Sequence, residues 1–266
     1  MNELHEANRR HWEARQAEWA KRAEAEGVWR RCAKEPGLIL DDRELHWLGD
    51  VAGKRIAVLG SGDNLVVFAL AGMGAQVTSV DIAENQLAVA RLRTEELGLA
   101  VEFVRADVTE LPELATGTVD LVYTGGHIAV WVSDLRKFYA EATRILKPGG
   151  RLIVSEYHPF RRIWKDNKDR LELFCDYLHR GPYAYDSSGT ACRSAECGQP
   201  GGTGSGSATE LSDEFQWTVS DYINAVLAAG CELLAVEELG TGSDGAWEVP
   251  PVGRLPRVLL VVGRKG

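Results

Sequence analysis

The feature that most constrains this chain is a regular alternation of short apolar runs with longer segments between residues 55 and 157. Each apolar run has the length of a strand, and each intervening segment is long enough for a helix. Strands that alternate with helices form a parallel sheet covered by helices on both faces, so we expect a doubly wound α/β fold. The five predicted strands are residues 55–59, 76–82, 101–108, 119–125 and 151–157.

The segments between these strands carry helix signals. Residues 64–74 are mostly apolar, as expected of a buried helix, and residues 83–97 have one apolar face that ends at Gly98. Ser133 is placed to cap a further helix, which Pro148-Gly149-Gly150 would stop. The signals agree with the alternation of strands and helices.

The alternation of strand and helix patterns stops after the fifth predicted strand. Residues 158–216 are polar and aromatic and then glycine-rich, and regular structure is expected to resume with a helix capped by Ser220. A strand at 231–238 and a last strand at 257–263 follow, which we expect to be antiparallel neighbours joined by the loop 239–256. The segment 158–216 is therefore interpreted as an insertion after strand five.

The first 50 residues are expected to form a helical lid over a main domain that spans residues 51–266. Trp12 and Trp19 are one heptad apart, so both indoles lie on one face of the predicted helix. That face could close over a ligand or pack on the sheet, and the sequence leaves both open. The aromatic residues of the insertion make it a candidate cover for a substrate.

Composition limits the kind of partner. Of the 266 residues 45% are apolar, enough for a sizeable core, and the net charge of −9 argues against nucleic acid. The sequence has no run of about 18 apolar residues and no apolar secretion signal, so we expect no membrane span. Five scattered cysteines are typical of a reduced, cytoplasmic protein. We interpret Cys192 and Cys197 as loop thiols and expect no metal site.

The stretch V-L-G-S-G-D-N-L at residues 58–65 is a glycine turn directly after the first strand. In such a turn, backbone N–H groups at the start of a helix face a nucleotide-containing cofactor. The dinucleotide fingerprint needs a glycine at its sixth place, where this chain has Leu65. Asp81 ends the second strand, where an acid can accept ribose hydroxyls, and Asp107 ends the third, where an acid can accept the adenine amine. Together these features favour S-adenosylmethionine over NAD.

In motif order and spacing the chain resembles the class I S-adenosylmethionine-dependent methyltransferases, closely over residues 55–155 and by pattern over 215–263. Asn64 is a departure, because the family usually has a third glycine there, but asparagine tolerates left-handed backbone angles. The resemblance implies a seven-stranded, mostly parallel sheet whose last strand is antiparallel. The motifs are V-L-G-S-G-D-N (58–64), V-T-S-V-D-I-A-E-N-Q-L-A-V-A-R (77–91), V-R-A-D-V (104–108), V-D-L-V-Y (119–123) and R-I-L-K-P-G-G-R-L-I-V (144–154).

The resemblance also implies S-adenosylmethionine as cofactor and methyl transfer to O, N or S of a small-molecule acceptor, by a monomer or homodimer. Each matched position takes a role. Gly60, Ser61, Gly62 and Asn64 would hold the methionine part, Asp81 the ribose, Ile82 and Gln86 the adenine border, Asp107 and Val108 the adenine amine and ring, and Tyr123 to Gly125, with Thr124 between them, the region under the sulfonium. Trp12 and Trp19 would close over the cofactor.

Two histidines follow predicted strands at the edge where ligands bind in open parallel sheets. His127 follows the fourth strand and His158 the fifth. Histidine is the side chain best suited to take a proton near pH 7, so each is a candidate catalytic base, with a pocket-lining role as the alternative. A cofactor-binding fold without transfer activity, a methyltransferase for a macromolecule and an NAD-dependent oxidoreductase remain alternative functions.

Overall fold

A computed structural model of the chain describes residues 2–62, 65–161, 163–164, 172–173, 175–185, 191–193, 212–240 and 255–266. The helices are α1 (Glu3–Glu26), α2 (Asp42–Leu48), α3 (Leu65–Gly72), α4 (Glu84–Leu97), α5 (Leu135–Ile145) and α6 (Val219–Ala228), with short 3-10 turns η1 (Val28–Arg30), η2 (Pro36–Leu38), η3 (Ala129–Trp131) and η4 (Pro159–Arg161). The strands are β1 (Arg55–Leu59), β2 (Gln76–Asp81), β3 (Val101–Arg105), β4 (Val119–Gly125), β5 (Leu146–Tyr157), β6 (Tyr183–Tyr185), β7 (Ala191–Arg193), β8 (Ser212–Glu214), β9 (Cys231–Leu239) and β10 (Val258–Lys265).

The main sheet has seven strands in the order β3-β2-β1-β4-β5-β10-β9. The pairs among β1 to β5 are all parallel, whereas β10 runs antiparallel to both β5 and β9. The order reverses between β1 and β4, so a ligand crevice is expected at the carboxyl ends of these strands. The expected fold, with β9 and β10 as antiparallel neighbours, is confirmed.

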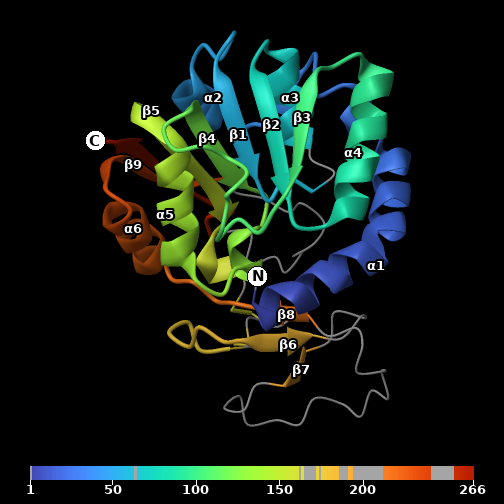
Figure 1. Cartoon of the computed structure of the whole chain (residues 1–266). Coiled ribbons are helices and arrows are strands. Elements are labelled where there is room, and N and C mark those ends of the chain that lie inside the picture. The colour runs from blue at the N-terminus through green and yellow to red at the C-terminus, as the bar shows by residue number, and fades with distance from the viewer. Residues whose placement is uncertain are drawn as a thin grey trace.

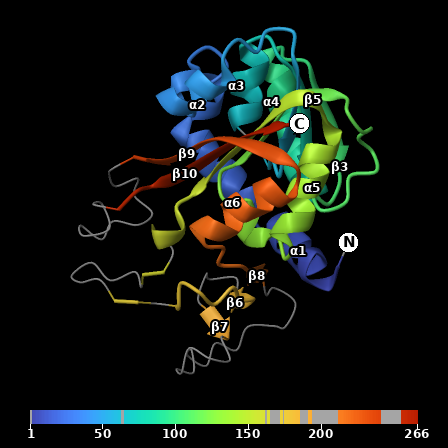
Figure 2. The same cartoon turned by 90° about the vertical axis from the view of Figure 1, so that its left-hand side faces the viewer.

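Helices cover both faces of this sheet (Figures 1 and 2). Side chains of α5 and α6 join one apolar core cluster with the sheet, and side chains of α3 and α4 join a second cluster with the opposite face. The β1 strand shows why both faces are filled: its last four residues are all buried. A strand covered on both sides must be apolar on both sides, which explains the continuous apolar runs of the sequence.

The edge formed by the carboxyl ends of the parallel strands is covered by parts of the chain that are distant in sequence. Helix α1 passes beneath these ends, and the small sheet β7-β6-β8 lies beyond it (Figure 1). Asn8 joins the two, because its amide donates to Asp213 O and accepts from Asp213 N, both at 2.8 Å. None of the helices in the described ranges has the length and apolar character that a membrane span requires.

Both predicted helix caps are wrong by one or two residues. Asp134 caps α5 by accepting a hydrogen bond from Lys137 N at 2.9 Å, while the hydroxyl of Ser133 contacts His5 Nε2 on α1 and Nδ2 of Asn2, the N-cap of α1. For α6 the cap is Thr218 and not Ser220, and Thr218 forms a capping box with Asp221. Tertiary contacts decide the first case, because they engage the Ser133 hydroxyl elsewhere.

Candidate cofactor and acceptor site

The glycine turn after β1 has the backbone that only glycine adopts easily. Gly60 and Gly62 have φ of +68° and +56°, and a Cβ on Gly60 would lie 2.2 Å from Cγ1 of Ile128. Ser61 faces the sheet, with its Oγ 2.6 Å from Ser79 Oγ, so it can offer a ligand its backbone only. Asn64 lies outside the described residues.

Asp81 ends β2 beside this turn. Its Oδ2 accepts a hydrogen bond from Gly62 N at 2.7 Å, and its Oδ1 accepts one from Ala83 N at 2.8 Å. These bonds fix the carboxylate against the glycine turn, as the ribose role requires. Gln86, one turn into α4, is 5% exposed and lies on the buried side of that helix.

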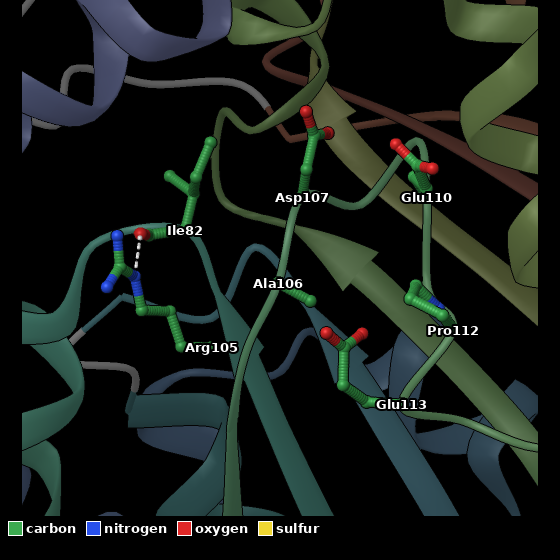
Figure 3. A pocket seen from close by; sticks show the side chains of 7 residues that line it. All are labelled: Ile82, Arg105, Ala106, Asp107, Glu110, Pro112 and Glu113. Atoms are coloured by element: carbon green, nitrogen blue, oxygen red, sulfur yellow. Dashed lines mark hydrogen bonds between the residues drawn. The ribbon is translucent and has the colours of Figure 1, made fainter. Parts of the chain in front are cut away.

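A cavity of about 210 Å³ lies at the ends of β2 and β3 (Figure 3). Its volume is below the roughly 300–1,000 Å³ of a complete ligand site, so it suits one ring of a cofactor. Val108 does not line it and belongs to the core beneath. The lining residues are Ile82, Arg105, Ala106, Asp107, Glu110, Pro112 and Glu113.

Asp107 lines this cavity and is also bonded to helix α1. His5 Nδ1 lies 2.8 Å from Asp107 Oδ2, while Oδ1 accepts from the N–H and the hydroxyl of Thr109. Burial would raise the pKa of Asp107, but the hydrogen bonds from His5 and Thr109 outweigh it and lower that pKa to about 2. Asp107 is therefore a fixed anion at neutral pH, suited to accept from an amine.

The end of β4 carries a second set of groups. The Thr124 hydroxyl is fully buried and has no hydrogen-bond partner among the described residues. A Cβ on Gly125 would lie 2.4 Å from Ser155 O, so no larger residue fits there. The Tyr123 hydroxyl, 3.1 Å from the place of that Cβ, is already engaged, because it donates to Glu44 on α2 at 2.7 Å. Buried polar groups are normally paired, so the Thr124 hydroxyl is suited to a bound ligand.

His127 follows directly with φ of +83°, the one non-glycine residue with positive φ in the described part of the chain. Its ring lies 4.7 Å from that of Tyr157 and 6.3 Å from that of Trp131, measured between centroids. Backbone held in a sparsely populated region costs on the order of 1–3 kcal/mol and is found mostly at functional sites. His127 thus stays a candidate for the base.

His158 is placed differently. It is completely buried, and its Nδ1 accepts a hydrogen bond from Phe160 N at 3.2 Å. Because a backbone N–H can only donate, the ring proton sits on Nε2, which lies 2.8 Å from Glu238 Oε1. Burial lowers the pKa of His158 although Glu238 opposes that shift. With both ring nitrogens engaged by Phe160 N and Glu238, His158 supports the loop after β5.

Helix α1 contributes side chains that the sequence analysis missed. Its buried residues are His5, Asn8 and His11, which share one face at a spacing of three. His11 stacks on Trp131 at 5.7 Å between centroids, and Trp12 meets the same ring at 5.1 Å. Trp19 lies 6.1 Å from Trp12. The spacing of three between these polar residues is the sequence signal that indicates this buried face, whereas the spacing of Trp12 and Trp19 does not reveal it.

The residues present fit S-adenosylmethionine. A Cβ on Gly62 would meet nothing within 4 Å, so a ligand can approach the backbone there, and the carboxylates of Asp81 and Asp107 are fixed acceptors at the neighbouring strand ends. The buried Thr124 hydroxyl, which has no partner in the part of the chain that the structure describes, lies at the adjoining strand end. Within the described ranges no group of three or more potential metal ligands is gathered.

A family model described as a methyltransferase domain matches residues 58–154. The ubiquinone biosynthesis O-methyltransferase of Bordetella pertussis is 31% identical over 157 residues, which cover 58% of this chain and 65% of that protein. The protein of the same name from Xanthomonas oryzae pv. oryzae is 36% identical over 106 residues, covering 40% and 44%. The chain thus spans less than two thirds of the length of these relatives.

Solved structures agree on the fold. An S-adenosylmethionine dependent methyltransferase from Mesorhizobium loti superimposes with a TM-score of 0.62 at 24% identity, covering 88% of this chain and 98% of that one. The geranyl diphosphate C-methyltransferase of Streptomyces coelicolor, solved with S-adenosyl-L-homocysteine, gives 0.54 at 16% identity, covering 84% and 76%. Residues 58–154 thus match a methyltransferase domain, and the chain shares its fold with S-adenosylmethionine-dependent methyltransferases.

Proposed function

We propose that this chain transfers a methyl group from S-adenosylmethionine to an oxygen atom of a small-molecule acceptor. The observation that carries the proposal is the meeting of three separate turns at one sheet edge: the glycines after β1, Asp81 after β2 and Asp107 after β3. The O-methyltransferase names of the matched relatives support oxygen as the methylated atom. The acidic composition, with a net charge of −9, favours a small acceptor over nucleic acid.

Each part of the cofactor has a group to hold it. Gly60 and Gly62 would pack against the methionine part, Asp81 would accept the ribose hydroxyls, and Asp107 would accept the adenine amine inside the cavity it lines. Ile82 borders that cavity as well. When bound, S-adenosylmethionine supplies a methyl group already activated by a sulfonium, so the protein has to orient the acceptor and exclude water.

The acceptor would lie at the ends of β4 and β5, next to Thr124 and His127. His127 Nδ1 is buried, so Nε2 is the ring nitrogen that can take the proton of an acceptor hydroxyl. Trp12 and Trp131 would exclude water, since they pack against each other across the gap between α1 and η3. We further propose that residues 1–50 act as a lid, that the insertion covers the acceptor, and that the protein works in the cytoplasm as a monomer or homodimer.

Calorimetric titration with S-adenosylmethionine, S-adenosylhomocysteine and NAD tests the cofactor. We expect saturable binding of both sulfur compounds and a raised melting temperature, because a ligand of the folded state stabilises it by mass action. Binding of NAD alone would overturn the proposal. Turnover is then measured with methyl-labelled S-adenosylmethionine and a panel of small phenols, alcohols and carboxylic acids. Tight cofactor binding without turnover on any class of hydroxyl would favour a cofactor-binding protein without transfer activity.

The role of His127 is tested with His127→Asn. Asparagine tolerates the positive φ of this position but cannot act as a base near neutral pH. We expect kcat to fall by about 10²- to 10⁴-fold, with the dissociation constant of S-adenosylhomocysteine changed little. His46→Asn, at an exposed position on α2, is the matched control and should keep full activity. An active His127→Asn variant would contradict the assignment.

A further inference from the structure

One histidine of helix α1 is bonded directly to an acid of the cavity. His5 is 2% exposed, and its Nε2 accepts a hydrogen bond from Ser133 N at 2.9 Å. A backbone N–H is always the donor, so Nε2 carries no proton in the neutral ring, and Nδ1 carries it instead. Nδ1 lies 2.8 Å from Asp107 Oδ2 and therefore donates to it. The protein thus contains a directed chain from Ser133 through His5 to Asp107.

This series of hydrogen bonds has a defined effect on the Asp107 carboxylate. Thr109 donates twice to Asp107 Oδ1, from its N–H and from its hydroxyl, while His5 holds Oδ2. Three of about four acceptor positions are then occupied by fixed donors. The side chain is only 8% exposed, so water cannot readily replace these donors. A carboxylate held in this way offers one remaining acceptor direction to whatever enters the cavity it lines.

We propose that His5 is a positioning residue for the cofactor site: it fixes Asp107 for the adenine amine, so that the His5–Asp107 hydrogen bond and binding of the cofactor strengthen each other. The inference rests on the proposed function, which assigns the cavity to adenine. It goes further because it makes the N-terminal helix part of cofactor recognition, through one named contact.

The structure supplies a control for simple loosening of the helix. Asn8, one turn along α1 from His5, is 3% exposed and binds Asp213 of β8 and the carbonyl of Trp131. It anchors the same helix without touching Asp107. Asn8→Ala therefore weakens the docking of α1, whereas a change at His5 weakens both the docking and the acid.

Two conservative variants separate the two bonds of His5. The amide of asparagine branches at the position of Nδ1 and can donate to Asp107, but it cannot reach Ser133. The amide of glutamine extends to the position of Nε2 and can accept from Ser133 N, but it leaves Asp107 without its donor. Calorimetric titration with S-adenosylhomocysteine is carried out on the full chain and on His5→Asn, His5→Gln and Asn8→Ala, beside thermal unfolding without ligand.

We expect His5→Gln to weaken S-adenosylhomocysteine binding by about tenfold or more, which is the order of loss seen when a group that orients a ligand-holding side chain is removed. His5→Asn should recover most of that loss, within about threefold of the parent. Asn8→Ala should lower the melting temperature while the affinity changes by less than about threefold. In hydrogen exchange, S-adenosylhomocysteine should protect α1 amides in the parent and much less in His5→Gln, because coupling is reciprocal.

Equal affinity in His5→Gln and the parent would overturn the inference. So would an Asn8→Ala variant that loses as much affinity as His5→Gln, because α1 docking alone would then explain the effect. These outcomes are distinct from failure of the proposed function, in which the parent chain itself would not bind S-adenosylhomocysteine.

Discussion

Replacing Asp81 by alanine gives a quantitative test of the cofactor site. The change removes the acceptor of Gly62 N and of Ala83 N, bonded at 2.7 and 2.8 Å. A donor left without a partner costs about 1–3 kcal/mol, and Gly62 is partly exposed to water, so we expect a total loss of about 2–4 kcal/mol. For a chain of this size that corresponds to a melting temperature lower by roughly 4–16 °C.

The same variant loses the charged acceptor for the ribose hydroxyls. Such a loss is worth about 1.5–3 kcal/mol, so S-adenosylhomocysteine should bind about 10- to 150-fold more weakly in calorimetry. Asp120→Ala is the matched control: Asp120 also accepts a backbone N–H, from Arg55 at 2.9 Å, but at the opposite edge of the sheet. The Asp120→Ala variant should be less stable than the parent but should bind S-adenosylhomocysteine with the same affinity. A folded Asp81→Ala variant with unchanged affinity would refute the placement of the ribose.

Three further predictions follow from single positions. Gly60→Ala should lower the free energy of unfolding by more than about 2 kcal/mol and abolish cofactor binding, because its Cβ would overlap Ile128. The control is Gly98→Ala, where φ is also positive but the Cβ would meet open space, so denaturant unfolding should show a loss of only about 1 kcal/mol. Thr124→Val should raise the melting temperature of the free protein, because it removes a buried hydroxyl that has no partner among the described residues. It should also reduce the stabilisation by S-adenosylhomocysteine or by an acceptor, and unchanged ligand stabilisation would mean that the hydroxyl serves no ligand. The lowered pKa of His158 means that the unfolded chain binds the proton more readily, so stability should fall as the pH drops below about 6.5. His158→Gln should flatten that dependence in unfolding measured from pH 7 to 5, and an unaltered slope would show that another group is responsible.

The location of the site was predictable because its residues follow strands. Asp81, Asp107 and His127 each stand directly after an apolar run, and the carboxyl ends of parallel strands meet at one edge whatever the loops contain. The prediction for His158 came from the same reasoning, but the structure places its two nitrogens on Phe160 and Glu238. Position along a strand indicates the edge, while the partners of a side chain depend on neighbours from other elements.

The sequence by itself determined the sheet, because strand and helix periods, glycine turns and apolar runs are local properties of the chain. The strands β1 and β4 match the predicted residues 55–59 and 119–125, whereas β3 ends at Arg105 and not at 108, and β5 begins at Leu146 and not at 151. Family spacing then added the order of the sheet, including the antiparallel β10.

Only the tertiary structure decided what covers the carboxyl edge. His5 meets Asp107 across 102 positions of sequence, and Asn8 meets Asp213 across 205. No local propensity encodes such pairs, since they arise when separately formed elements pack and their buried polar groups must find partners. The need to pair buried polar groups also explains why Asp134 and not Ser133 caps α5, because the Ser133 hydroxyl is bonded to His5 on α1. Strand and turn chemistry therefore located the site, and the packing of α1 against it determined how its acids are held.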